Sequence, residues 1–211
     1  MDYNYLLELF EACLEIEYQH VEEGGSFATL RDGDKLWIFF EKSNGREDWF
    51  NNLSYRAVKV EREGEVWFCH EGFLKVWQAV LPYLHQLLSS PSVKQVSIVG
   101  YSHGAALALL CHEYVGYLRP DLEDALEGYG FGCPRVIFGV VPDEGRRWRS
   151  FYVVRNVDDA VTHLPPRFIG YRHVGKLIMI GKRGRYSAID AHKPENYIRE
   201  LNAAHKQLDK P

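Results

Sequence analysis

The sequence lacks a long apolar run, an excess of basic residues and a leader-like start. No stretch approaches the roughly 18 apolar residues that a membrane-spanning helix needs, and the first residues do not join a positive segment to an apolar core as a secretory leader does. We therefore expect no transmembrane segment and a cytoplasmic location. Lys and Arg number 25 against 29 Asp and Glu, a net charge of -4, so nucleic acid is not an expected partner.

Paired cysteine motifs, internal repeats and Pro/Gly/Ser-rich linkers are also missing. The four cysteines have apolar neighbours and form no C-x-x-C pair, which favours buried free thiols over disulfides or a zinc site: Cys13, Cys69, Cys111 and Cys133. We expect no metal and no cofactor. Hydrophobic residues make up 46% of the chain, so residues 1–211 are expected to form a single domain with a sizeable core.

The hydrophobic pattern changes its period along the chain. The first twenty residues place apolar side chains on one helical face. Short β-rich runs follow at 26–30, 35–41, 55–61 and 66–69. Helices and strands then alternate: helix 73–88, strand 95–99, helix 102–118, strands 126–130, 150–155 and 170–180, and helix 194–208. Pro82 is expected to kink or restart the first of these helices. This order predicts an α/β protein with a mostly parallel sheet and helices on both faces.

The most informative segment is the pentapeptide Gly-Tyr-Ser-His-Gly at 100–104, between a buried strand and a helix. A G-x-S-x-G sequence in this context is typical of a nucleophile elbow, a sharp turn that presents the serine hydroxyl. The N-terminus of the following helix would place the amide of His103 near an oxyanion formed at Ser102. The alternative interpretation is a glycine-rich turn in which Ser102 only caps the helix.

An elbow serine needs an acid and a base, which follow it along the chain in this type of hydrolase. Asp158 and Asp159 come directly after the strand 150–155, at the sheet edge where such sites form, and their position alone leaves the choice between them open. We favour His192, in a loop before the last helix, as the base. The other downstream histidines are expected to be structural or exposed: His163, His173 and His205.

Several segments together resemble the class 3 lipase family, over most of the chain. Residues 69–73 (CHEGF) are similar to the family's V-H-x-G-F, residues 100–107 (GYSHGAAL) to G-H-S-L-G-G-A-L, and residues 129–136 (YGFGCPRV) to Y-x-F-G-x-P-R-V. Residues 155–166 resemble N-x-x-D-x-V-P-x-L-P-P, which implies Asp159 as the triad acid. Residues 192–197 resemble H-x-x-x-x-Y, which implies His192 as the catalytic histidine.

The resemblance implies an α/β-hydrolase fold and a lipase or esterase that cleaves acyl esters, such as acylglycerols, through an acyl-enzyme on Ser102. It also implies Ser43 as an oxyanion donor beside His103, because residues 39–53 are similar to F-R-G-T/S through D-W-x-x-N-L. The chain departs from the family at Glu41-Lys42, in place of Arg-Gly, and at His103, in place of leucine. Residues 44–52 are either a lid or a plain connection.

Two other kinds of function remain open on the sequence. A phospholipase A1, a thioesterase or an acyltransferase would use the same triad on a different acyl donor or acceptor. A catalytically inactive hydrolase-like domain would instead bind a lipid or a protein, and the unusual Glu41-Lys42 pair favours that alternative. For the lipase interpretation we expect a lipid ester as substrate and transient contact with a lipid surface.

Overall fold

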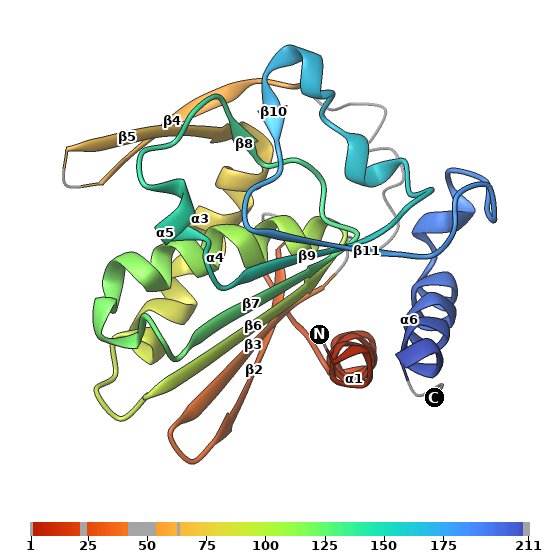
Figure 1. Cartoon of the computed structure of the whole chain (residues 1–211). Coiled ribbons are helices and arrows are strands. Elements are labelled where there is room, and N and C mark those ends of the chain that lie inside the picture. The colour runs from red at the N-terminus through yellow and green to blue at the C-terminus, as the bar shows by residue number, and fades with distance from the viewer. Residues whose placement is uncertain (1, 22–24, 42–53, 63, 209–211) are drawn as a thin grey trace.

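The computed structural model describes residues 2–21, 25–41, 54–62 and 64–208. A seven-stranded sheet forms its centre, in the order β1-β2-β3-β6-β7-β9-β11 (Figure 1). The strands β3, β6, β7, β9 and β11 run parallel, and β1 and β2 are added antiparallel. Their bounds are β1 Gln19–His20, β2 Ser26–Asp32, β3 Lys35–Phe40, β6 Gln95–Tyr101, β7 Leu126–Phe131, β9 Phe151–Asn156 and β11 Lys176–Ile180.

Helices cover both faces of this sheet, as the sequence predicted (Figure 1). The helices α3 (Glu71–Leu88) and α4 (His103–Leu118) lie on one face. The first and last helices, α1 (Tyr3–Glu15) and α6 (Pro194–Leu208), pack beside each other on the opposite face. Side chains of the central strands alternate between the two cores, because successive strand residues point to opposite faces.

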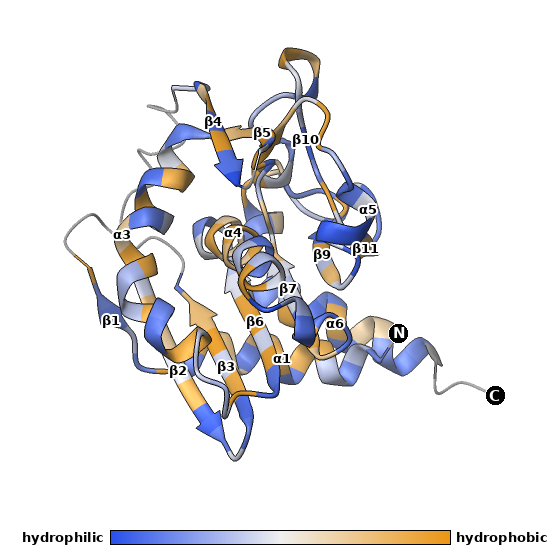
Figure 2. Cartoon of the chain, turned by 90° about the vertical axis from the view of Figure 1, so that its left-hand side faces the viewer, coloured by the Kyte–Doolittle hydropathy of each residue, from blue (hydrophilic) through white to orange (hydrophobic). Residues whose placement is uncertain are grey.

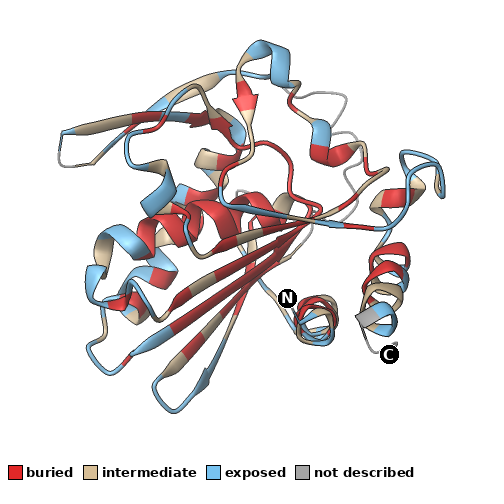
Figure 3. Cartoon of the chain, viewed as in Figure 1, coloured by how far each residue is buried: buried red, intermediate tan, exposed pale blue. Residues whose placement is uncertain are grey.

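Burial follows this layered arrangement. The inner strands and α4 are buried along most of their length (Figure 3). Figure 2 shows hydrophobic residues along β3 and β6, which is the pattern of strands covered on both faces. The four cysteines are free and buried, as expected. Among the described residues no helix is long and apolar enough to cross a membrane.

A second, four-stranded sheet lies above α4 in Figure 1, on the side of this helix away from the large sheet. Its order is β10-β8-β5-β4, all antiparallel, with β4 Ala57–Arg62, β5 Glu65–His70, β8 Ile137–Phe138 and β10 Tyr171–Arg172. The predicted strand 170–180 is wrong as one element, because it is divided between β10 and β11. Gly175, which lies between these two strands, has a positive φ of 83°, which lets the chain turn from one sheet to the other.

The remaining elements are short, and α3 does not restart at its proline. They are α5 Glu144–Arg147 and the 3-10 turns η1 Pro120–Leu122, η2 Val161–His163, η3 Arg167–Ile169 and η4 Asp190–His192. The helix α3 continues through Pro82 instead of restarting there. Packing of its buried face, which includes Trp77, Val80 and Leu84, outweighs the loss of one backbone hydrogen bond at the proline.

Candidate active site

Ser102 lies at the turn between β6 and α4, with φ 55° and ψ -119°. This is a strained conformation for a residue with a side chain. Two glycines permit it: a Cβ atom on Gly100 would lie 2.2 Å from the carbonyl oxygen of Gly104, and one on Gly104 would lie 2.2 Å from that of Phe40. The Ser102 side chain makes no capping hydrogen bond to α4. The local geometry is therefore that of an elbow, and the helix-cap interpretation is wrong.

The structure brings Ser102, His192 and Asp159 together in one chain of hydrogen bonds. His192 Nε2 lies 2.8 Å from Ser102 Oγ, and His192 Nδ1 lies 2.7 Å from Asp159 Oδ2. Asp159 follows β9 and is fully buried, whereas His192 ends η4 just before α6. A carboxylate on Nδ1 holds the imidazole tautomer whose Nε2 can accept the serine proton.

Two further donors hold the Asp159 carboxylate. The Tyr197 hydroxyl donates to Oδ2 at 2.6 Å, and the Val161 amide donates to Oδ1 at 2.9 Å. Burial raises the pKa of Tyr197 well above its ordinary value, so its phenol stays protonated and acts as a donor. These bonds fix the carboxylate toward His192 and compensate for its burial.

The imidazole of His192 is positioned by three neighbours. The Tyr101 ring stacks on it with centroids 5.2 Å apart and an angle of 26°, and the Tyr101 hydroxyl donates to the His192 carbonyl oxygen. Asn156 Nδ2 donates to the carbonyl oxygen of the preceding residue, Ala191, at 3.2 Å. Gly132 has φ 58°, and a Cβ atom there would lie 2.9 Å from His192 Cε1. Any side chain at position 132 would displace the imidazole.

The sequence analysis did not identify these positioning residues, although the sequence contained a signal for three of them. Tyr197 closes the segment that resembles H-x-x-x-x-Y, Gly132 lies in the one that resembles Y-x-F-G-x-P-R-V, and Asn156 opens the one that resembles N-x-x-D-x-V-P-x-L-P-P. Tyr101 carried no signal of its own, because the variable position before an elbow serine accepts many residue types.

The Asp158 side chain has different hydrogen-bond partners from that of Asp159. Its carboxylate accepts the backbone N–H groups of Gly184 at 3.0 Å and Arg185 at 2.9 Å. The hydrogen bond from Gly184 lowers the pKa of Asp158. The side chain therefore anchors the loop after β11, and the structure gives the contact with His192 to Asp159 alone.

Two other histidines, His163 and His173, lie near Asp159 and make structural contacts. His173 Nε2 lies 2.8 Å from the carbonyl oxygen of Thr162, and burial lowers the pKa of His173 to about 4, so it stays neutral. His163 contacts the Arg155 guanidinium. These contacts agree with the structural role expected for both histidines. His205 lies on α6.

Of the two predicted oxyanion donors, only His103 lies within the described residues. His103 is the first residue of α4, whose first-turn amides point toward Ser102. Burial lowers the pKa of His103 to about 4, and its ring lies 5.5 Å from that of Phe73. Ser43 and Lys42 fall outside the described residues, as does the stretch 44–52. The described end of β3 does reach the elbow, because a Cβ atom on Gly104 would lie 2.5 Å from the carbonyl oxygen of Glu41.

Comparison with known proteins points to one family. Residues 37–169 match the family model described as lipase (class 3). A lipase from Rhizomucor miehei is 30% identical over 156 residues, which cover 69% of this chain and 42% of the relative. A secreted mono- and diacylglycerol lipase from Fusarium solani is 34% identical over 114 residues, which cover 49% of this chain and 32% of the relative. The chain thus spans less than half the length of these relatives.

Solved structures show the same fold. The triacylglyceride lipase of Rhizomucor miehei gives a TM-score of 0.65 at 25% identity, over 79% of this chain and 66% of that one. A triacylglycerol lipase whose catalytic centre is a serine protease triad gives 0.65 at 26% identity, with the same coverage of 79% and 66%. A lipase from Rhizopus microsporus var. chinensis gives a TM-score of 0.65 at 22% identity, over 88% of this chain and 69% of that one. These likenesses confirm the predicted α/β-hydrolase fold.

The predicted cytoplasmic location is contradicted by the Fusarium solani relative, which is a secreted lipase. The cysteines do not decide the compartment either. All four thiols are buried, and a buried thiol is inert in an oxidising as well as in a reducing environment.

Family membership follows from the extent of the match and from the fold that contains it. The matched residues 37–169 make up more than half of the 211 residues. They include the elbow and Asp159, and the structures that share the fold are lipases. The chain belongs to the class 3 lipase family.

Proposed function

We propose that this chain is a serine carboxylic ester hydrolase that acts on acylglycerols. The observation that carries the proposal is the relay from Ser102 Oγ through His192 to Asp159, at 2.8 and 2.7 Å. It starts at an elbow whose strained serine follows a parallel strand. The relatives support the substrate class, since they are a lipase and a mono- and diacylglycerol lipase. The Fusarium solani protein also supports an extracellular location.

In the proposed mechanism Ser102 Oγ attacks the ester carbonyl carbon while His192 Nε2 accepts the serine proton. Asp159 stabilises the imidazolium that forms. The anionic carbonyl oxygen accepts backbone N–H groups from His103 and Ser43. His192 then donates its proton to the departing alcohol oxygen, which leaves the acyl-enzyme. Water attacks the acyl carbon by the same route, and the carboxylic acid is released.

Ser43 is the less directly supported of the two oxyanion donors. The carbonyl oxygens of Phe40 and Glu41 lie against Gly104, so the chain enters the stretch that contains Ser43 at the elbow itself. The described chain therefore stops at the elbow two residues before Ser43, which supports the proposal that the Ser43 backbone N–H is the second donor. Loss of one such donor typically lowers kcat by about 10² to 10³.

The described residues also support one catalytic unit rather than several. Hydrogen bonding in the large sheet is continuous from β1 to β11, and α1 packs against α6. The three triad residues come from positions 102, 159 and 192, so the site needs the middle and the last third of the chain together.

Transient contact with a lipid surface is part of the proposal. Val140 and Phe168 are 87% and 89% exposed, and the Gly139 amide donates to the Gly170 carbonyl oxygen at 3.0 Å, which brings their loops together. Exposed apolar side chains of this kind favour partition into a bilayer surface. Phe168→Ser should lower co-sedimentation with phosphatidylcholine vesicles, whereas Tyr83→Ser, at an exposed aromatic on α3, should not.

The direct test is turnover of a substrate panel by the wild type and by Ser102→Ala. We expect p-nitrophenyl esters and a monoacylglycerol to be hydrolysed by the wild type only. Preference for the sn-1 ester of a phospholipid, for a thioester, or for transfer to an added alcohol would assign the triad to the corresponding alternative. Folded wild-type protein that turns over none of them would favour the inactive binding domain.

A further inference from the structure

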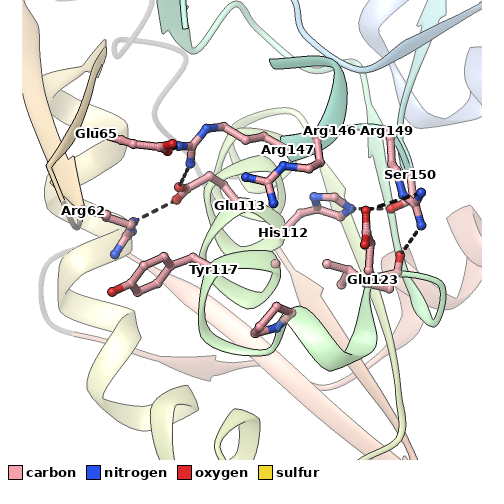
Figure 4. A pocket seen from close by; sticks show the side chains of 13 residues that line it. Arg62, Glu65, His112, Glu113, Tyr117, Glu123, Arg146, Arg147, Arg149 and Ser150 are labelled. Atoms are coloured by element: carbon pink, nitrogen blue, oxygen red, sulfur yellow. Dashed lines mark hydrogen bonds and ion pairs between the residues drawn. The ribbon is translucent and has the colours of Figure 1, made fainter. Parts of the chain in front are cut away.

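A pocket lies toward the far end of α4 (Figure 4). Its lining includes His112 and residues 116–117 of α4, which come ten or more residues after Ser102. At 1.5 Å rise per residue they lie roughly 15 Å or more from the nucleophile along the helix. The other walls come from the β4–β5 hairpin, from α5 and from the segment before β9. The pocket is therefore separate from the triad.

Four arginines and three glutamates line the pocket, and two of these arginines, Arg146 and Arg149, also pair with the neighbouring Asp143 and Asp124. Both carboxylate oxygens of the buried Glu113 are already engaged. Arg62 Nε lies 3.1 Å from Glu113 Oε2, and Arg147 Nη1 lies 3.0 Å from Oε1. Arg147 also pairs with Glu65. This network holds the walls in place.

Two guanidinium groups on the pocket have N–H donors to spare. The terminal amino groups of Arg62 make no hydrogen bond to a described residue, because only its Nε does so. The side chain of Arg146 makes no hydrogen bond in the described part of the chain, and its one ion pair there is an exposed contact of 3.6 Å with Asp143. In Figure 4 Arg146 extends from α5 over the pocket, toward Glu113 and His112. Guanidinium N–H groups of this kind bind carboxylate or phosphate oxygens.

The floor of the pocket adds apolar surface. Leu126, Tyr117 and Gly116 line this part. His112 is 1% exposed, and its Nε2 lies 3.0 Å from Ser150 Oγ. Burial lowers the pKa of His112 to about 3, so the ring is neutral and does not add to the charge.

We propose that this pocket binds an organic carboxylate. The carboxylate would lie between Arg62 and Arg146, and its apolar part would lie on Gly116, Tyr117 and Leu126. Two guanidinium groups with spare N–H donors match one carboxylate, and the apolar floor favours an organic acid over inorganic phosphate. The site is independent of the proposed ester hydrolysis, since none of its residues contacts the triad.

Gly116 provides the sharpest test. A Cβ atom on it would meet only Leu126 Cδ2, at 3.7 Å, an ordinary contact. Gly116→Leu should therefore fold, and its side chain should fill the floor of the pocket. By calorimetric titration we expect octanoate to bind the wild type, and Gly116→Leu to weaken that binding at least about tenfold. Gly145→Ala, in α5 with nothing within 4 Å of the added atom, should bind like the wild type.

A second variant and two further probes test the charged and apolar parts separately. Arg146→Gln should weaken octanoate about tenfold, the effect of losing a charge-assisted hydrogen bond. Octan-1-ol, which lacks the charge, and inorganic phosphate, which lacks the chain, should both bind more weakly than octanoate. Octanoate binding unchanged in folded Gly116→Leu would place the ligand elsewhere, including at the triad, and would overturn the proposal. The titration needs no turnover, so its failure is distinct from failure of the proposed hydrolase activity.

Discussion

Asp158 and Asp159 are adjacent carboxylates with different partners, which makes them a matched pair at the scale of single residues. Asp159→Asn should lower kcat by about 10⁴, because the amide no longer selects the imidazole tautomer that activates Ser102. Asp158→Asn removes only the anchor of the loop at 184–185. We expect that variant to keep kcat within about threefold of the wild type, as for a change outside the relay. Ester turnover measures both.

Equal losses in the two variants would contradict the assignment of the acid to Asp159. A lower kcat in Asp158→Asn alone would assign the triad acid to Asp158 instead. Circular dichroism of each variant separates loss of the relay from loss of the fold.

The two aspartates also show how far residue-level prediction can go. Both follow the same strand, so position in the sequence leaves them equivalent, and only the resemblance favoured Asp159. The side-chain directions depend on contacts with distant segments: the loop at 184–186 for Asp158, and Tyr197 and His192 for Asp159. Such contacts are not encoded in the local pattern.

At the scale of elements, the elbow requires the close approach of β3, β6 and α4 at Gly104. Gly104→Ala should destabilise the protein by about 3 kcal/mol, because the added Cβ overlaps the Phe40 carbonyl oxygen and backbone must move. Gly116→Ala, in the same helix, should instead stabilise it by about 0.5–1 kcal/mol through helix propensity. Urea unfolding of both variants tests this. Similar unfolding midpoints would mean that the elbow is not tightly packed.

Elements whose own residues carry a strong hydrophobic pattern could be predicted from the sequence. Strands that form only by hydrogen bonding to a distant strand could not. The segment 95–118 contains an apolar strand, a glycine-flanked serine and an alanine-rich helix, so strand, elbow and helix follow from neighbouring residues. The two-residue strands β8 and β10 exist only because they pair with β5 and with each other. Ser43 lies outside the described residues, and its predicted role stays a prediction.

At the scale of the whole molecule, buried neutral histidines predict acid sensitivity. His70 is 2% exposed and accepts the Gly72 amide at Nδ1. Burial lowers its pKa to about 4 and that of His112 to about 3. The unfolded chain takes up these protons near pH 6.5 and the folded chain does not. The contribution of these histidines to the free energy of unfolding is therefore complete above about pH 6.5. It decreases as the pH drops toward 4, by up to about 1.4 kcal/mol per pH unit for each histidine.

Urea unfolding between pH 4 and pH 7.5 measures this dependence. His112→Gln should flatten it, because one proton-linked group is removed, and the exposed His20→Gln is the control that keeps the wild-type slope. A folding free energy that does not change across this range would show that the buried histidines are not held neutral.

The most direct test of the central claim is the attachment site of a fluorophosphonate, which phosphonylates an activated serine. We predict one adduct on the intact wild-type chain, mapped by peptide mass spectrometry to Ser102. Ser102→Ala should form no adduct, and His192→Ala and Asp159→Asn should react much more slowly. An adduct on another residue, or none on folded wild-type protein, would contradict the assignment of Ser102 as the nucleophile.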